Sequence, residues 1–242
     1  MFKSISLALA FSAMAGAAGA TTLTVFDGVT AGKTSFNSTV AAAGGVVHNS
    51  IWSTAGSGTE LDFGEYKVTR NNGGSFWGPN GYGSLSGGTV DISPNGTGPG
   101  MGAFDSGITF TFDNPVNALG FEVGDWATCC HPSALFMSFD GGAPIQVANA
   151  ISYDDGLFPS QNNPDLNVYE IFVAAFDDSG SFTSVSFWGD GFGEYLVAGG
   201  HVKYALLDEG SLPPPAPVPL PAGGLLLVSG LAALVLRRRK TT

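Results

Sequence analysis

Two pairs of carboxylates could bind a cation. Asp190 and Glu194 flank a Gly-Phe-Gly triplet, and Glu122 and Asp125 flank a Val-Gly pair. We expect both pairs at strand ends, where backbone carbonyls can add oxygen ligands. Hard oxygen ligands suit calcium, although neither spacing matches the EF-hand loop. Turn and edge carboxylates in water give the same pattern, so calcium is a candidate cofactor and no firm metal site is assigned.

The same carboxylates could act as the acid and base of a glycoside hydrolase, which needs two of them in one cleft. Other catalytic signals are weak. Residues 83–87 place Leu85 where a Gly-x-Ser-x-Gly motif needs serine. The three histidines, His48, His131 and His201, have no recognisable triad context. We therefore expect a protein that is not an enzyme, with no catalytic or cofactor-binding residue.

Cys129 and Cys130 are adjacent, and they are the only cysteines in the chain. Three states compete: a vicinal disulfide that stiffens the turn 126–132, pairing with another molecule, and two free thiols. We favour the vicinal disulfide, although neighbouring Cα atoms are closer than in most disulfides. A metal site formed with His131 is disfavoured, because three consecutive side chains do not readily converge on a tetrahedral zinc.

Aromatic residues offer a different kind of chemistry. Trp77 lies beside Phe76 and near Tyr82 in the glycine-rich segment 71–101, the least regular part of the chain. Irregular loops of this length often carry function. An exposed Trp77 would stack on a sugar ring, whereas a buried one would only fill the core.

The elements that must hold these residues are strands. Apolar residues alternate with polar ones, as in Ile108, Phe110 and Phe112, and turn signals such as Asp140-Gly141 separate the runs. The expected strands are 23–26, 46–52, 61–69, 89–92, 108–112, 119–123, 135–139, 145–151, 168–176, 182–188 and 195–206. One helix is expected at 35–43. This pattern predicts an all-β fold, a two-layer antiparallel sandwich of the jelly-roll kind.

Charge is divided unevenly along the chain. The formal net charge is −11, and all 20 acidic residues lie between Asp27 and Glu209, against four basic residues in that stretch. Such an acidic surface repels phosphate backbones, so nucleic acid is excluded as a partner.

The two ends have the composition of targeting segments. Residues 1–20 combine Lys3, an apolar stretch and Ala18-Gly19-Ala20, which is typical of a cleaved signal peptide. Near the other end a proline-rich segment precedes an uncharged apolar run and then Arg237-Arg238-Arg239-Lys240. A helix over 222–236 would be about 22 Å long at ~1.5 Å per residue, short for a membrane span. The terminal cations would stay cytoplasmic and leave the acidic middle outside.

The C-terminal region resembles the PEP-CTERM class of bacterial sorting signals in its Val-Pro-Leu-Pro-Ala variant. The motif is Val218, Pro219, Leu220, Pro221 and Ala222, followed by the apolar run and the arginine cluster. The Pro-Glu-Pro triplet that names the class is absent. The resemblance implies recognition by an exosortase, a membrane-embedded cysteine protease or transpeptidase. A sortase signal and a plain single-pass anchor are alternatives.

These features predict a signal peptide at 1–20, a β-sandwich ectodomain at 21–211, a stalk with the sorting motif at 212–221, a transmembrane helix at 222–236 and a basic tail at 237–242. We expect an exported envelope or extracellular-matrix protein with a structural or adhesive role. Its expected partners are an exosortase, the membrane and extracellular polysaccharide. The main alternative is a calcium-dependent carbohydrate-binding module, and a glycoside hydrolase is the least favoured.

Overall fold

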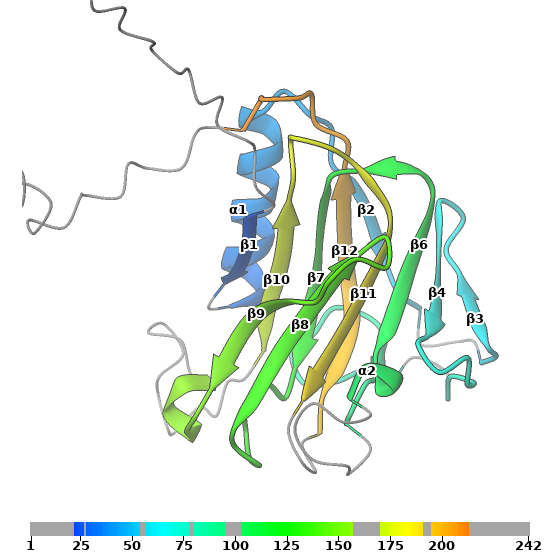
Figure 1. Cartoon of the computed structure of the whole chain (residues 1–242), viewed down its shortest axis with the longest axis vertical. Helices are drawn as coiled ribbons and strands as arrows, with labels where there is room; N and C mark the ends of the chain where they lie inside the picture. The colour runs from blue at the N-terminus through cyan, green and yellow to red at the C-terminus, as the bar shows by residue number, and fades with distance from the viewer. Residues whose placement is uncertain are drawn as a thin grey trace, which may run out of the picture. The chain divides into compact units, whose positions relative to one another are not determined.

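The alternating residues form strands that pair into two antiparallel sheets (Figure 1). The computed structural model describes residues 22–26, 28–53, 57–77, 80–94, 103–156, 170–190 and 195–212. The inner faces of the two sheets share one hydrophobic core. The prediction of an all-β sandwich is therefore confirmed.

The first sheet, called sheet I here, contains the strands nearest the helix α1. Its order is β1 (Thr22–Phe26), β10 (Ile171–Phe176), β7 (Ala118–Gly124), β12 (Val197–Ala205) and β2 (His48–Ile51), with β5 (Thr89–Asp91) also paired to β12. Its central strand β7 is buried at every position.

The second sheet, sheet II, has the order β3 (Glu60–Asp62), β4 (Tyr66–Arg70), β6 (Ile108–Val116), β11 (Phe182–Asp190), β8 (Ser133–Phe139) and β9 (Ile145–Ala150). From β5 onward the chain passes back and forth between the sheets. Strands β5, β7, β10 and β12 belong to sheet I, and β6, β8, β9 and β11 belong to sheet II.

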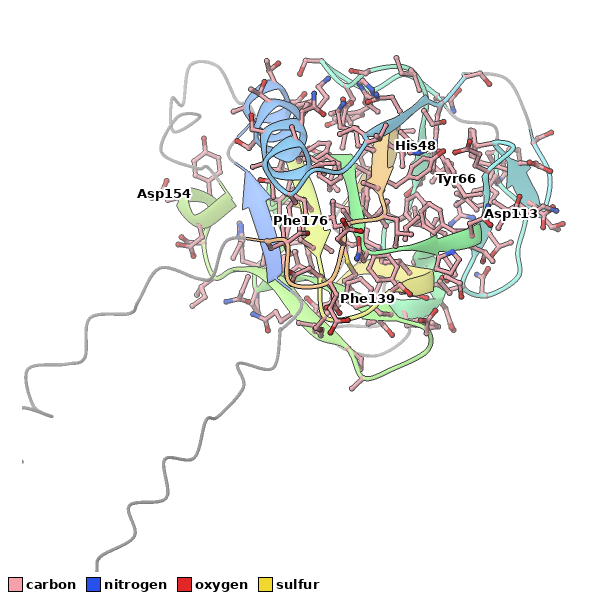
Figure 2. The ribbon with its side chains drawn as sticks, turned by 90° about the horizontal axis from the view of Figure 1, so that it is seen from above. His48, Tyr66, Asp113, Phe139, Asp154 and Phe176 are labelled. Atoms are coloured by element: carbon pink, nitrogen blue, oxygen red, sulfur yellow. A yellow bond between two sulfur atoms is a disulfide. The ribbon has the colours of Figure 1, made fainter. Side chains whose placement is uncertain are left out.

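Aromatic rings fill the space between the sheets. Phe121 of sheet I has its ring centroid 5.1 Å from that of Phe110 and 4.8 Å from that of Phe187, both on sheet II. Trp52 Nε1 donates a hydrogen bond to the hydroxyl of Tyr66 at 2.8 Å, and Figure 2 labels Tyr66 among these side chains. Burial raises the pKa of Tyr66 to about 12, so its hydroxyl stays protonated and remains paired with the indole N–H of Trp52.

Helix α1 (Val29–Ala42) covers the outer face of sheet I. Phe36 and Val40 are buried, as their spacing predicts, and the ring of Phe36 lies 5.1 Å from that of Phe176, which Figure 2 labels beside the helix. The helix begins six residues before the predicted start at residue 35. A Cβ at Gly32 would lie 2.3 Å from the Cβ of Phe172, so glycine there allows the first turns to rest on the sheet.

Two other predictions need correction. The expected strand 61–69 is two strands, because Phe63 N–H bonds to Tyr66 O and Asp62 accepts a hydrogen bond from Gly64 N–H in a tight turn. Asp113-Asn114-Pro115 has the composition of a turn, but it lies inside β6. These three residues are exposed, and the pairing of β6 with β11 shifts register there, so Pro115 occupies a strand irregularity.

The remaining helical elements are α2 (Ala103–Ser106) and η1 (Tyr153–Gly156). Within the described ranges, no helix has both the length and the apolar character needed to cross a bilayer. The predicted signal peptide at 1–20 and the predicted transmembrane helix at 222–236 lie outside those ranges.

Replacing Phe121 by alanine should lower the free energy of unfolding by about 3–5 kcal/mol, because the side chain is fully buried between rings of the opposite sheet. Urea denaturation followed by tryptophan fluorescence measures this loss. Ile151→Ala is the matched control, since Ile151 is 73% exposed, and it should change stability by less than about 0.5 kcal/mol. Equal effects of the two changes would contradict the assigned core.

Candidate functional site

A cavity of about 200 Å³ is lined by residues from both sheets and from the glycine-rich segment. Sheet II contributes the end of β4, and sheet I contributes β5 and the start of β12. The lining residues are Arg70, Trp77, Asn80, Gly81, Tyr82, Thr89, Val90, Asp91, Tyr195 and Val197. The lining therefore combines aromatic rings with planar polar groups.

Trp77 is displayed at this cavity because its neighbour is anchored in the core. Phe76 is 2% exposed, its N–H bonds to Gly58 O at 2.7 Å, and the two residues form a β-bridge. Successive residues of extended chain point to opposite sides. Trp77 is accordingly 90% exposed, whereas Trp52, Trp126 and Trp188 are buried.

The position of Arg70 is fixed by contacts on several sides. Its Nε donates to Ser75 O at 3.2 Å, one terminal nitrogen donates to Ser106 O at 3.3 Å, and the guanidinium lies 5.3 Å from the centroid of the Phe76 ring. These contacts hold one cation at the wall of the cavity without a carboxylate partner among the described residues.

Asn80 extends the wall formed by β5. Its N–H bonds to Thr89 O at 2.9 Å, and its carbonyl accepts the Thr89 N–H at 2.7 Å and the Thr89 hydroxyl at 2.9 Å. Asp91 lies on the same strand, and its Oδ1 accepts the Ser93 N–H at 2.7 Å. Backbone pairing thus fixes the main chain at Asn80 and Asp91 before any ligand arrives.

Two tyrosines complete the lining. The rings of Tyr82 and Tyr195 are 5.9 Å apart. Burial raises the pKa of Tyr82, and the carboxylates of Asp125 and Glu170 raise it further. Burial, followed by Asp91 and Asp125, raises the pKa of Tyr195 in the same way. Both phenols therefore remain neutral hydrogen-bond donors near neutral pH.

The carboxylate pair Glu122 and Asp125 is divided between two environments. Asp125 interacts with Tyr82, beside the cavity. Glu122 lies inside β7 rather than at its end, and it is fully buried. Its carboxylate accepts hydrogen bonds from Lys33 Nζ at 2.9 Å and from Ser86 N–H at 2.6 Å. The charge of Glu122 is thus already compensated by helix α1.

The second pair is described only in part. Asp190 ends β11, where its Oδ1 accepts the Ala134 N–H at 2.7 Å and its carbonyl accepts the Ser133 hydroxyl at 2.7 Å. Burial raises the pKa of the Asp190 carboxyl. Glu194 lies outside the described residues. Across the residues that the structure describes, no group of three or more His, Cys, Asp or Glu side chains is placed to hold a metal ion.

Cys129 and Cys130 are joined by a disulfide with their Cα atoms 3.8 Å apart. They lie in an irregular turn in which Ala127 and Cys130 have positive φ and the His131-Pro132 peptide is cis. His131 Nε2 is 3.1 Å from Ala127 O. The imidazole thus contacts the backbone of its own turn.

The structure places His48 in a second cavity of about 200 Å³. His48 Nδ1 lies 3.1 Å from Glu65 Oε2, which also accepts a hydrogen bond from the Tyr204 hydroxyl. The hydrogen bond from Tyr204 lowers the pKa of Glu65, and His48 lowers it further. This cluster links β2 and β12 of sheet I to the β3–β4 turn of sheet II.

Sequence reasoning identified Trp77 but missed Arg70, Asn80, Asp91 and Tyr195 as its neighbours. Of these four, only Arg70 stands out in the sequence, as one of four basic residues in the acidic stretch.

The sorting motif at 218–222 lies outside the described residues. No protein-family model matches the chain, and no curated protein matches it.

Lys33→Met should reduce the free energy of unfolding by about 3 kcal/mol, because it leaves the fully buried carboxylate of Glu122 without its cation. The matched control is Lys67→Met. Lys67 lies 2.8 Å from Glu60, but both side chains are more than 40% exposed, so this loss should be about 0–1 kcal/mol. Chemical denaturation of both variants measures the difference, and equal losses would contradict the burial of the Lys33–Glu122 pair.

Proposed function

We propose that this chain is an exported protein of the cell envelope or extracellular matrix whose sandwich adheres to polysaccharide through the cavity beside Trp77. The observation that carries the proposal is the exposure of Trp77, 90%, at the rim of a cavity that also contains Arg70, Asn80 and Asp91. A large aromatic ring held in water is costly unless something covers it.

A sugar ring fits this combination of groups. Its C–H face can stack on the indole, and its hydroxyls can pair with a carboxylate, an amide and a guanidinium. The cavity is of a size that suits one or two sugar units rather than a large cofactor. The acidic surface disfavours uronic acids and other anionic glycans, so a neutral polysaccharide is the proposed ligand.

The role is binding rather than hydrolysis. Asp91 lines the cavity, and the charges of Asp91 and Asp125 raise the pKa of Tyr195. The proposal gives neither carboxylate a part in bond cleavage. Calcium would enter only as a structural aid near these two carboxylates.

The strand order supports the jelly-roll form of the sandwich. The orders β10-β7-β12-β5 and β6-β11-β8-β9 follow the nesting typical of that fold.

Export and anchoring are proposed from the two ends of the sequence. The signal peptide at 1–20 would deliver the acidic ectodomain outside the cytoplasm, and the tail from Val218 onward would be recognised by an exosortase. An adhesive domain on a proline-rich stalk suits a protein retained at the envelope or released into its matrix.

Trp77→Ala should weaken binding to a neutral polysaccharide by about 30-fold, equivalent to about 2 kcal/mol. Binding is measured by glycan-array screening followed by fluorescence titration. Ile151→Ala is the control because Ile151 is also strongly exposed, at 73%, and it should bind like the unchanged protein.

The same titration decides between the alternatives. Loss of binding on chelation would favour the calcium-dependent form, and release of reducing sugar would favour a hydrolase. Failure of the unchanged protein to bind any neutral glycan, or full binding by Trp77→Ala, would contradict the proposed site.

Intact mass of the protein recovered from its native envelope tests export and processing. We expect a chain that begins at Thr21 and has lost its C-terminal basic cluster, as the signal-peptide pattern and the sorting motif predict. Full-length chain that retains Met1 and lies free among cytosolic proteins would contradict export.

A further inference from the structure

Lys203 is a buried lysine whose direct partner is an amide. It lies on β12 and is only 3% exposed. Its Nζ donates a hydrogen bond to Oδ1 of Asn49, 2.5 Å away. The two residues are Cα partners in the pairing of β12 with the edge strand β2. Their side chains therefore point to the same face of the sheet and are direct cross-strand neighbours.

Glu122 is the carboxylate whose charge acts on Lys203, but it already has other hydrogen-bond partners. Glu122 accepts hydrogen bonds from Lys33 and from Ser86, and within the described residues Lys203 forms no ion pair of its own. Burial lowers the pKa of Lys203, and the charge of Lys33 lowers it further, while Glu122 acts in the opposite direction. A lysine that loses its proton more easily becomes a nucleophile.

We propose that Lys203 and Asn49 form an intramolecular isopeptide bond. The lone pair of the neutral Nζ attacks Cγ of Asn49, so that the Nζ–Cγ bond forms and the Cγ–Nδ2 bond breaks. Nδ2 leaves as ammonia after it receives the proton that Nζ gives up. One amide replaces another, and the reaction needs neither an oxidant nor a reductant. Asn49 is exposed, so the ammonia can leave into solvent.

A neighbouring imidazole can carry this proton. His201 lies two residues from Lys203 on the same strand, and its Nε2 is buried without a hydrogen-bond partner among the described residues. Burial lowers the pKa of His201, followed by the charges of Lys203 and Lys33, so the ring is neutral and able to accept a proton. The charge of Glu122 acts in the opposite direction on both side chains, and its carboxylate stays bound to Lys33 and Ser86.

The bond would join two positions separated by 154 residues. It would fasten the edge strand β2 to β12, the last strand of the sandwich, and close most of the fold into one covalent ring. Cross-links that close long loops restrict the unfolded chain most strongly. A pull on the C-terminal side of β12 would then pass to β2 without unfolding the strands between them. The bond itself does not depend on the proposed function.

Peptide mapping of the purified full-length chain tests the proposal. Trypsin should leave peptide 34–67, which contains Asn49, covalently attached to the peptide that contains Lys203, with no cleavage after Lys203 and a mass lower by one ammonia. Succinimide formation at an Asn-Gly pair such as Asn72-Gly73 also loses ammonia, but it leaves the peptides separate. Linear peptides with unmodified Asn49 and cleavage after Lys203 would overturn the proposal, whatever the intact mass.

Matched variants identify the atoms. Lys203→Arg keeps a cation and a donor for Asn49 but lacks the amine, so the linked peptide should disappear while circular dichroism shows the same strand content. Asn49→Ser removes the acyl group from an exposed edge position and should have the same effect. Lys67→Arg, an exposed change on sheet II, should retain the link. A linked peptide that persists in Lys203→Arg would also overturn the assignment.

Discussion

Enclosure of sheet I on both faces is the constraint on which the rest of the structure depends. Its inner face packs on sheet II, and its outer face packs under α1, so β7 has no solvent-facing side. Close approach of the helix requires glycine at position 32. A polar residue buried on the outer face needs a partner from the sheet or the helix. Glu122 is accordingly paired with Lys33 of the helix, and Lys203 donates a hydrogen bond to Asn49 on the neighbouring strand.

Sheet I encloses its side chains, whereas the cavity beside Trp77 keeps a large side chain exposed. There the chain forms short bridges, such as those between Gly58 and Phe76 and between Asn80 and Thr89. These bridges fix the backbone, and the alternation of extended chain then sends Phe76 into the core and Trp77 into water. A rigid support under an exposed aromatic ring lowers the entropy lost when a ligand binds. Stability and recognition are therefore supplied by adjacent residues of one short segment.

The sequence was sufficient for the strands whose apolar residues alternate clearly, and for the helix face formed by Phe36 and Val40. It could not place the helix start, because that depends on the fit of Gly32 against Phe172, a residue distant in the chain. Nor could it separate Glu122 from Asp125, because β7 ends at Gly124, between them, and that end is set by pairing with strands distant in the chain. The exposure of Trp77 depends on a bridge to Gly58 that no local pattern indicates.

Hydrogen–deuterium exchange of the full-length chain tests the enclosure of sheet I most directly. Amides that open only with global unfolding exchange slowest. The account predicts the slowest exchange in peptides from β7 and β12, and much faster exchange in the edge strand β9, whose residues are mostly exposed or half-buried. Exchange in β7 as fast as in β9 would contradict the packing of α1 over sheet I and the buried charges that follow from it.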